Sequence, residues 1–462
     1  MPSTPSNAFS ALPLRPELLQ ALDQLKYEQM TPIQALSLPL LLAGKDVIGQ
    51  ARTGSGKTAA YGLGLLSQLD PALARVQALV LCPTRELADQ IAKEIRRLAR
   101  FMPNIKLTVL SGGIDKRPQL ASLAHEPHIV VGMAGRVLEL IEADALKLDQ
   151  LKVLVLDEAD RMLDSDFEAA SREIVARSPS GRQTLFFSAT FPDNVRDLSR
   201  RLQRRPVEAT IDTTAPSAQL EEVFYEVDPD TRTDALAHLL STRRPQSALI
   251  FCHTRHDAQD LSDALAERGY SVLALHGHID QRERDEVLVR FANGSIRVLV
   301  ATDVAARGLD IKDLEAVISF ELAKEADAHI HRIGRTGRAG SKGLALHLVG
   351  PRELERIEAL DEKRGGKIRL QKLPTQLEPD NPRPPTVTTL CIDAGRVDKL
   401  RPGDILGALT VEGGLVKEAV GKINTYDTRS YVAIDLKHAN KALKLLQQGK
   451  IKGKKFRVRT ID

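Results

Sequence analysis

Short, mostly apolar runs alternate with longer amphipathic stretches along much of the chain. Runs of this kind occupy residues 153–156, 184–187, 298–301 and 316–319. A continuous apolar run of this length is typical of a strand buried on both faces, and amphipathic segments between such runs are typical of helices that cover a parallel sheet. The pattern therefore predicts doubly wound α/β sheets, in which ligands bind at the carboxyl ends of the strands.

Two segments of the chain repeat one another closely. Residues 78–85 read Ala-Leu-Val-Leu-Cys-Pro-Thr-Arg, and residues 248–255 read Ala-Leu-Ile-Phe-Cys-His-Thr-Arg. Each is an apolar run that ends in Cys-x-Thr-Arg and leads into a helical stretch, so the pattern indicates an internal duplication. We expect two tandem parallel-sheet lobes at residues 1–212 and 220–374, joined by a short flexible linker at 212–218.

A second boundary is marked by prolines. Five of them lie between residues 374 and 385, which is too many for either a helix or a central strand. The pattern of residues 386–462 predicts elements in the order β-α-β-β-α-β, which is typical of a small ferredoxin-like or RRM-like α+β domain. The strands are expected at 388–393, 420–423, 431–434 and 456–461, and the helices at 402–409 and 436–447.

At 462 residues the chain is too long for one ordinary hydrophobic core, and 42% of its residues are hydrophobic. Its three cysteines, Cys82, Cys252 and Cys391, show no pair with ligand or redox spacing. This composition argues against a disulfide scaffold or a zinc site and suits a reducing cytoplasm. The first residues lack the basic-then-apolar pattern of a signal peptide, so we expect a cytoplasmic protein with no membrane segment.

The net charge of +4 is unevenly distributed. Residues 386–462 hold 15 lysines and arginines against 8 acidic residues, a net of +7, which leaves −3 for the rest of the chain. A basic domain on a nearly neutral body indicates a polyanionic partner, although a solvated lysine-rich surface would give the same count.

A glycine-rich segment follows the β-rich residues 46–50 and precedes a helical stretch at 58–69. Gly54 and Gly56 permit a close approach of the backbone, so that successive N–H groups and the positive helix end can face phosphate oxygens. Lys57 would reach the β- and γ-phosphates of ATP, and the Thr58 hydroxyl would hold Mg²⁺. An ordinary glycine turn before a helix is the alternative. The predicted nucleotide-binding residues are Ala51, Arg52, Thr53, Gly54, Ser55, Gly56, Lys57 and Thr58.

Acidic residues follow the apolar run at 153–156, in the tetrad Asp157-Glu158-Ala159-Asp160. ATP hydrolysis needs one carboxylate near Mg²⁺ and one near water. Asp157 would therefore hold Mg²⁺ together with Thr58, and Glu158 would orient and deprotonate the attacking water. Asp160 would form a link across the two-lobed motor. In isolation, an acidic strand end would instead be interpreted as a helix N-cap.

The tetrad, together with other motifs in order between residues 9 and 350, resembles the DEAD-box ATP-dependent RNA helicases. The resemblance implies two RecA-like lobes that use ATP and Mg²⁺. It also implies an adenine-reading segment with Phe9, Thr31 and Gln34, whose amide can both donate and accept hydrogen bonds. Ser188-Ala189-Thr190 resembles the element that couples the ATP state to unwinding.

Further motifs resemble the family's RNA contacts. In the first lobe they imply contacts from Pro83, Thr84, Arg85, Gly112, Gly113, Gly135 and Arg136. In the second lobe they imply contacts from Gln281, Arg284 and Thr302, in elements that also include Phe251 and Asp303. The family's usual Thr-Pro before Gly-Arg is Met133-Ala134 here. This change removes a hydroxyl for an RNA phosphate and a stiffening proline, so we expect a weaker grip by the first lobe.

The second half also carries the motif His331-Arg332-Ile333-Gly334-Arg335-Thr336-Gly337-Arg338. The resemblance implies that Arg335 and Arg338 are arginine fingers delivered from the second lobe, and that Gly308 and Asp310 lie near the ribose. A planar, permanently charged guanidinium suits this role, because it can meet the charge that develops on a transferred phosphoryl group. The ATPase would then be active only when the lobes close, and RNA would gate that closure.

The C-terminal domain narrows the resemblance to the DbpA subgroup of bacterial helicases, through residues 389–393, 401–409 and 449–454. The RRM-like domain of that subgroup recognises a hairpin of 23S ribosomal RNA. Because Tyr431 is the one obvious aromatic candidate for base stacking, binding through a basic edge is the better interpretation. The predicted contacts of this edge are Lys450, Lys452, Lys454, Lys455 and Arg457.

The resemblance as a whole implies a monomeric, RNA-stimulated ATPase that locally opens short 23S rRNA duplexes during assembly of the large ribosomal subunit. A DNA-directed helicase and an ATP-gated RNA clamp that does not unwind are the alternatives. Only the motif family argues against DNA, because DNA shares base edges and phosphates with RNA.

Overall fold

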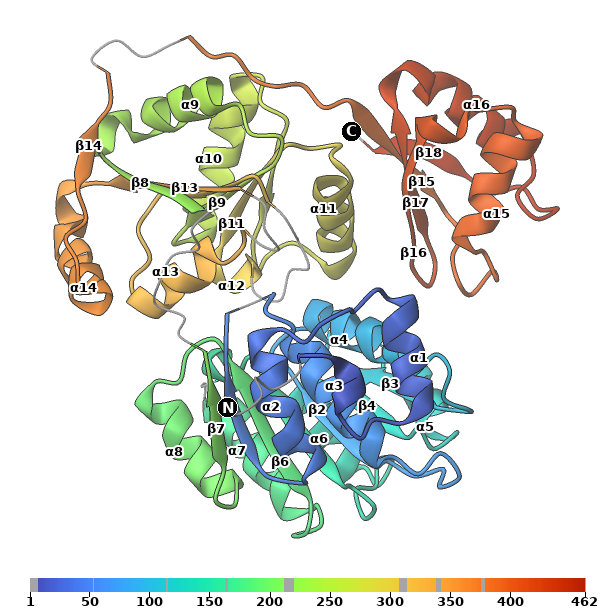
Figure 1. Ribbon diagram of the computed structural model, residues 1–462. Coiled ribbons are helices and arrows are strands. Elements are labelled where there is room, and N and C mark those ends of the chain that lie inside the picture. Colours follow the sequence, from blue (N-terminus) through green and yellow to red (C-terminus); the bar gives the residue numbers. More distant parts are fainter. Residues whose placement is uncertain are drawn as a thin grey trace. The chain divides into compact units, whose positions relative to one another are not determined.

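Figure 1 shows the computed structural model of the protein, which describes residues 7–52, 54–113, 115–162, 165–211, 220–306, 314–337, 342–374 and 379–461. Two compact units hold, respectively, the described residues up to 211 and those from 220 onward. The predicted linker at 212–218 lies outside the described residues. None of the helices in these ranges is long and apolar enough to cross a membrane.

The first unit, the first lobe, contains seven strands and eight α-helices among its described residues. The strands are β1 (Val47–Gln50), β2 (Ala78–Leu81), β3 (Leu107–Leu110), β4 (Ile129–Gly132), β5 (Val153–Asp157), β6 (Gln183–Ser188) and β7 (Val207–Thr210). The helices are α1 (Pro16–Gln24), α2 (Pro32–Leu42), α3 (Lys57–Gln68), α4 (Arg85–Leu98), α5 (Arg117–Leu123), α6 (Ala134–Glu142), α7 (Ser165–Ala176) and α8 (Asp193–Leu202).

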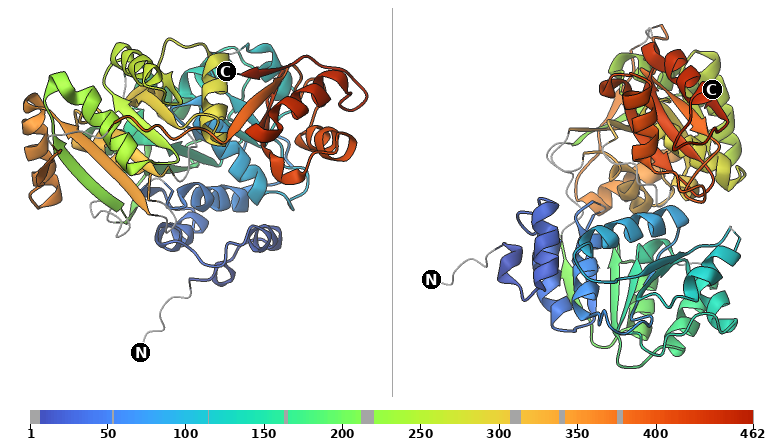
Figure 2. Two further views of the ribbon diagram at one scale, coloured as in Figure 1. Left: turned by 90° about the horizontal axis from the view of Figure 1, so that it is seen from above. Right: turned by 90° about the vertical axis from the view of Figure 1, so that its right-hand side faces the viewer.

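These strands form one parallel sheet in the order β3-β4-β2-β5-β6-β1-β7. Alternate residues of β5 enter different cores: Val153 and Val155 pack into one, and Leu154 and Leu156 pack into the other. Both faces of the sheet are therefore buried beneath helices, which the right-hand view of Figure 2 shows. This arrangement confirms the predicted doubly wound architecture.

The second unit begins with a second lobe, whose described residues also include seven strands. The strands are β8 (Leu220–Glu226), β9 (Ala248–Cys252), β10 (Val272–Leu275), β11 (Val298–Thr302), β12 (Ala316–Ser319), β13 (Gly343–Val349) and β14 (Leu370–Lys372). The helices are α9 (Arg232–Arg243), α10 (Arg255–Glu267), α11 (Gln281–Asn293), α12 (Asp303–Ala306), α13 (Ala326–Ile333) and α14 (Leu354–Arg364).

The second sheet is parallel and has the order β10-β11-β9-β12-β13-β8-β14, which repeats the first order strand for strand. The two Cys-x-Thr-Arg segments follow the equivalent strands β2 and β9, and in each the threonine caps the next helix. The N–H of Leu87 donates to Thr84 Oγ1 (3.3 Å), and the N–H of Asp257 donates to Thr254 Oγ1 (3.1 Å). The predicted duplication is therefore confirmed.

The C-terminal domain of the second unit is a four-stranded antiparallel sheet with helices. Its elements are β15 (Val387–Ile392), α15 (Pro402–Gly407), β16 (Val420–Thr425), β17 (Ser430–Asp435), α16 (Ala439–Gln448) and β18 (Val458–Ile461). The sheet order is β16-β17-β15-β18, and the predicted β-α-β-β-α-β succession is confirmed. The helix predicted at 402–409 ends two residues early and continues as a π-helical turn at Ala408–Glu412.

A buried polar cluster in the second lobe joins the sheet to α13 and α14. Glu222 on β8 accepts hydrogen bonds from His329 Nε2 (2.9 Å), His347 Nε2 (3.2 Å) and Arg364 Nη2 (2.7 Å). Two histidines and a carboxylate are a common set of metal ligands. Here the guanidinium of Arg364 supplies a positive charge directly to the Glu222 carboxylate.

The charge state of this cluster depends on burial. Burial lowers the pKa of His347 to about 4 and also lowers the pKa of His329. Burial alone would raise the pKa of Glu222, but the hydrogen bonds from His329, His347 and Arg364 hold it well below its usual value. In the unfolded chain a histidine regains a pKa near 6.5. The unfolded chain therefore binds more protons between about pH 6.5 and 4, and the lobe loses stability as the pH falls through this window.

Lowering the pH from 7.5 to 5.5 is expected to destabilise the second lobe by about 1 kcal/mol through His347 alone. His347→Gln should remove that part of the pH dependence, because a glutamine amide can donate to Glu222 without titrating. Hydrogen exchange of amides in β8 and β13 measures the opening free energy at each pH. His256→Gln, which changes an exposed histidine of α10, is the control. Equal pH dependence in the wild type and in His347→Gln would contradict this account.

Candidate nucleotide and RNA sites

The glycine-rich segment forms the loop between β1 and α3. Gly54 and Gly56 have φ angles of +84° and +94°, left-handed values that favour glycine. A Cβ on Gly56 would lie 2.5 Å from Gln34 Nε2, so a larger residue would collide with that side chain. Gly56 is also the N-cap of α3. The loop therefore presents the N-terminus of a helix, an anion-binding end, directly after β1.

Lys57, the first residue of α3, is buried and donates from Nζ to the carbonyl oxygen of Ala51 (2.5 Å). Burial lowers the pKa of Lys57, and the negative charges of Asp157 and Glu158 oppose that shift. The ammonium group is thus held by its own loop, within electrostatic reach of the carboxylates at the end of β5.

Asp157 is the last residue of β5 and is 3% exposed. Its Oδ1 accepts a hydrogen bond from the N–H of Glu158 (3.0 Å), and its Oδ2 accepts one from the hydroxyl of Tyr61 (2.7 Å). Burial raises the pKa of Asp157 to about 6, against the opposing charge of Lys57.

The contact between Tyr61 and Asp157 also bears on the predicted Mg²⁺ ligands. Tyr61 lies on α3 three residues after Thr58, so the two side chains share one face of the helix, a turn apart. That face is the one that reaches Asp157. The Thr58 hydroxyl and the Asp157 carboxylate therefore fit a site for Mg²⁺, which prefers oxygen ligands.

Glu158 has a φ of +54°, a left-handed backbone that is uncommon outside glycine. Its Oε2 lies 3.3 Å from Nη1 of Arg161, and the two side chains are 10% and 8% exposed. Sequence reasoning misses Tyr61, because its contact depends on how α3 packs over the sheet. The ion pair of Glu158 with Arg161, in contrast, had a local signal in the sequence, because the two residues are three positions apart.

Thr31 and Gln34, predicted to read adenine, contact the glycine-rich loop. The Thr31 hydroxyl donates to the carbonyl oxygen of Ser55 (2.7 Å), and Gln34 Nε2 donates to that of Gly56 (3.1 Å). Gln34 Oε1 also accepts from the Thr31 N–H (2.9 Å) at the beginning of α2. Phe9 packs into the core of the first lobe. The segment is therefore bonded to the predicted phosphate site, and its contact with a base stays a prediction.

Ser188 and Thr190 lie between the loop and the acidic tetrad, because β6 separates β1 from β5 in the sheet. Oδ2 of Asp160 accepts hydrogen bonds from the hydroxyl (2.6 Å) and the N–H (3.2 Å) of Thr190. The N–H of Asp160 donates to Ser188 Oγ (3.3 Å). These contacts join the tetrad to the predicted coupling element within the first lobe, and a link of Asp160 across the two lobes stays a prediction.

The predicted RNA contacts of the first lobe follow three neighbouring strands. Pro83, Thr84 and Arg85 follow β2, Gly112 and Gly113 follow β3, and Gly135 and Arg136 lie in the first turn of α6 after β4. Because parallel strands end at the same edge of a sheet, the structure brings these segments together. Met133 is the N-cap of α6, and its side chain makes no capping hydrogen bond.

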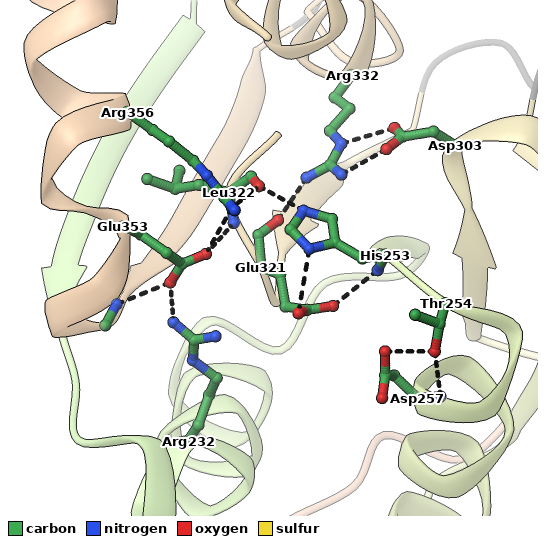
Figure 3. A network of polar contacts seen from close by, with 11 residues as sticks. Arg232, His253, Thr254, Asp257, Asp303, Glu321, Leu322, Arg332, Glu353 and Arg356 are labelled. Atoms are coloured by element: carbon green, nitrogen blue, oxygen red, sulfur yellow. Dashed lines mark hydrogen bonds and ion pairs between the residues drawn. The ribbon is translucent and has the colours of Figure 1, made fainter. Parts of the chain in front are cut away.

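Figure 3 shows the polar network at the carboxyl ends of β9, β11 and β12. Arg332 on α13 donates to Oδ1 and Oδ2 of Asp303 (2.8 and 2.7 Å) and to the carbonyl oxygen of Glu321 (2.5 Å). Its guanidinium carbon lies 4.9 Å from the ring centre of Phe251. Arg332 therefore joins the arginine-rich motif to Asp303 and Phe251, which lie in two elements that are predicted to bind RNA.

A second set of contacts in Figure 3 fixes the segment between β12 and α13. The N–H of His253 donates to Glu321 Oε2 (2.7 Å), and its ring Nε2 lies 2.7 Å from the carbonyl oxygen of Leu322. Burial alone would raise the pKa of Glu321, but the hydrogen bonds from His253 hold it at about 2. Glu353 accepts from the N–H of Leu322 (2.8 Å) and from Arg232.

Arg335 follows α13 closely and is 4% exposed. Gln281 and Arg284 lie in the first turn of α11, and Arg284 donates to the carbonyl oxygen of Ala305 (2.7 Å). The N–H of Ala305 in turn donates to Thr302 Oγ1 (3.3 Å), so Arg284 and Thr302 meet at the end of β11.

Four predicted nucleotide-site residues lie outside the described residues: Thr53, Gly308, Asp310 and Arg338.

Tyr431, the predicted candidate for base stacking, is covered by α11 of the second lobe. It is 2% exposed and packs in a cluster with Val289, Cys391 and Ile461. Its hydroxyl donates to Glu286 Oε1 on α11 (3.3 Å). In this structure the ring is therefore not available to stack on a base.

The same helix, α11, contacts one part of the basic edge of the C-terminal domain and leaves the other part exposed. Glu286 Oε1 also accepts from Arg429 (2.8 Å) and Arg459 (3.3 Å), so Arg459 faces α11. The predicted RNA contacts Lys450, Lys452, Lys454, Lys455 and Arg457 are all exposed. The part of the edge that the sequence assigns to RNA is thus open to solvent.

Three family models match consecutive parts of the chain. They are DEAD/DEAH box helicase at residues 31–198, Helicase conserved C-terminal domain at 231–340 and DbpA RNA binding domain at 389–460. The ATP-dependent RNA helicase DbpA of Escherichia coli (strain K12) is 51% identical over 460 residues, which cover 98% of this chain and 99% of that protein. The DEAD-box ATP-dependent RNA helicase CshA of Geobacillus kaustophilus (strain HTA426) is 39% identical over 79% of each chain.

Solved structures agree with this assignment. S. cerevisiae Dbp5 bound to RNA and ADP BeF3 has a TM-score of 0.73 and 31% identity, covering 80% of this chain and 96% of that one. The DEAD-box helicase Mss116 bound to ssRNA and UDP-BeF has a TM-score of 0.71 and 26% identity, covering 80% of each chain. The chain belongs to the DEAD-box family of ATP-dependent RNA helicases. Within that family it is similar to DbpA of Escherichia coli, and it carries the DbpA RNA-binding domain.

Met133→Thr is expected to restore a side-chain cap to α6 and to raise the unfolding free energy by about 1 kcal/mol. The added hydroxyl should also tighten RNA binding, because it lies beside Gly135 and Arg136. Met133→Val is the matched control, since valine has the shape of threonine without its hydroxyl. RNA affinity is measured with a non-hydrolysable ATP analogue present. Equal affinities of the Thr and Val variants would show that this hydroxyl makes no phosphate contact.

Proposed function

We propose that this RNA helicase hydrolyses ATP when RNA closes its two lobes, and that it opens short duplexes of 23S rRNA during assembly of the large ribosomal subunit. The observation that carries the proposal is a pairing of two features in one chain. The glycine-rich loop and helix α3 of the first lobe lie beside the strand end at Asp157-Glu158, and the C-terminal region matches the DbpA RNA binding domain.

The first lobe would bind the nucleotide. The phosphates of ATP would lie at the N-terminus of α3, where Lys57 would leave the carbonyl of Ala51 for the β- and γ-phosphates. Thr58 and Asp157 would hold Mg²⁺, which when bound neutralises phosphate charge. Glu158 would orient the attacking water and accept its proton.

The second lobe would supply positive charge to the reacting phosphate. Arg335 and Arg338 would act as arginine fingers, contacts that are typically worth about 10³ to 10⁵ in rate. Gly308 and Asp310 would contact the ribose. The bidentate pair of Arg332 with Asp303 supports this role, because it fixes the helix that immediately precedes Arg335.

RNA would control this step through the same network. Thr302 and Arg284 lie at the end of β11, directly beside Asp303. An RNA strand bound there would contact the element that holds Arg332 in place. RNA bound at Thr302 and Arg284 would therefore influence hydrolysis through Asp303 and Arg332, all within the second lobe.

The C-terminal domain would select the RNA. Its exposed lysines between 450 and 455 would bind the phosphates of a 23S rRNA hairpin. Because this domain contacts α11, whose first turn carries Gln281 and Arg284, RNA held by one site is kept near the other. We propose that the protein is a monomer that acts in the cytoplasm. The described cysteines are free, buried thiols, which suits that reducing compartment.

The test compares ATP hydrolysis stimulated by a 23S rRNA fragment, unrelated RNA and DNA. Wild type should respond at the lowest concentration to the 23S fragment. In Lys452→Glu/Lys454→Glu/Lys455→Glu, that concentration should rise to the level of unrelated RNA, while the rate at saturating RNA stays the same. The full chain is used, because removing the domain would expose Val289, which packs against Cys391, Tyr431 and Ile461 of that domain.

Charge reversal at three other exposed lysines of the same domain gives the matched control. Lys437→Glu/Lys441→Glu/Lys444→Glu introduces the same charge around α16 instead of the basic edge. Equal responses of wild type to 23S and unrelated RNA would remove the ribosomal assignment. Stimulation by DNA would support the alternative substrate, and ATP hydrolysis without strand displacement would support an RNA clamp.

A further inference from the structure

Tyr61 is a fully buried tyrosine in the first lobe that belongs to none of the recognised motifs. It lies on α3, one turn after Thr58, and it is 0% exposed. Its ring packs against Phe187 of β6, with ring centres 5.4 Å apart. Its hydroxyl donates a hydrogen bond to Oδ2 of Asp157 over 2.7 Å.

This hydrogen bond completes the fixation of the Asp157 carboxylate. The other oxygen, Oδ1, accepts from the backbone N–H of Glu158 over 3.0 Å. Two donors on two different oxygens, one from the backbone and one from α3, set the rotation of the carboxylate about its own axis. Lys57 adds a nearby positive charge.

A purely space-filling role would not require the hydroxyl. Phenylalanine would fill the same volume against Phe187 without a polar atom to satisfy. Because burying a hydroxyl is costly unless it is hydrogen-bonded, the partner matters. The partner of Tyr61 is the carboxylate at the nucleotide site, whereas Tyr270 in the second lobe donates to an ordinary backbone carbonyl, that of Ala237 (2.9 Å).

We propose that Tyr61 is a positioning residue that holds the Asp157 carboxylate in the orientation that binds Mg²⁺. The inference rests on the Mg²⁺ role given to Asp157 above. Residues that donate a hydrogen bond to a metal ligand orient it, and their loss typically costs about 10- to 100-fold in metal affinity. Tyr61 does not touch Mg²⁺ or nucleotide in this account; it acts through Asp157.

Tyr61→Phe tests the proposal with the removal of one oxygen atom. Binding of fluorescent ADP is followed as Mg²⁺ is titrated, so that the readout is affinity and not turnover. The Mg²⁺ concentration at half-saturation should rise by about 10- to 100-fold. ADP affinity in EDTA should stay at the wild-type value, and ATP hydrolysis should recover as Mg²⁺ is raised.

Two further variants make the outcome decisive. Tyr270→Phe removes a buried, hydrogen-bonded hydroxyl from the second lobe and should leave the Mg²⁺ titration unchanged. Asp157→Asn should raise the Mg²⁺ concentration at half-saturation more than Tyr61→Phe does. Thermal unfolding confirms that each variant is folded.

The two possible failures are distinguishable. If Asp157→Asn shifts the Mg²⁺ titration and a folded Tyr61→Phe does not, the positioning role of Tyr61 is overturned while the Mg²⁺ role of Asp157 stands. If neither variant shifts it, the Mg²⁺ role of Asp157 fails, and the inference about Tyr61 fails with it.

Discussion

The first lobe is organised around a carboxylate, Asp157, that the fold buries almost completely. Burial of a charged group is costly unless partners compensate it. Here the partners come from different parts of the chain: the N–H of Glu158, the hydroxyl of Tyr61 and the charge of Lys57. All of them meet because parallel strands send their carboxyl ends to one edge of the sheet. The same constraint positions the glycine-rich loop, residues 188–190 and the predicted RNA contacts of this lobe.

The second lobe repeats the sheet order and uses it for different chemistry. Strand β8 occupies the place of β1, but the segment after it is Val227-Asp228-Pro229-Asp230, which contains no glycine loop for phosphate. The strand ends of this lobe instead anchor an arginine: Arg332 is held by Asp303, Phe251 and the carbonyl of Glu321. One duplicated scaffold thus presents carboxylates and a glycine-rich loop in one copy, and the guanidinium of Arg332 in the other.

The strands and the two repeated lobes were predictable, because apolar runs and turn residues are local signals. The run at 316–319 coincides with β12, and the C-terminal succession of elements is correct. The contacts of Tyr61 and Tyr431 were not predictable, because each joins residues that are about a hundred or more positions apart in the sequence. The sequence could show that Tyr431 is aromatic and lies on a strand, but not that Glu286 of another domain covers it. Gln34 was assigned to a base, and its bond to the Gly56 carbonyl emerged only from the packing of α2 against the loop.

The central claim is that the first lobe binds the nucleotide and that arginines of the second lobe complete the hydrolytic site. Arg335→Ala tests it most directly, with fluorescent ADP binding and ATP hydrolysis at saturating RNA measured on the same preparation. We expect unchanged ADP affinity in the absence of RNA and a fall of about 10³-fold or more in stimulated turnover, with little rescue in Arg335→Lys. A stimulated turnover close to that of the wild type would contradict the claim that hydrolysis depends on both lobes.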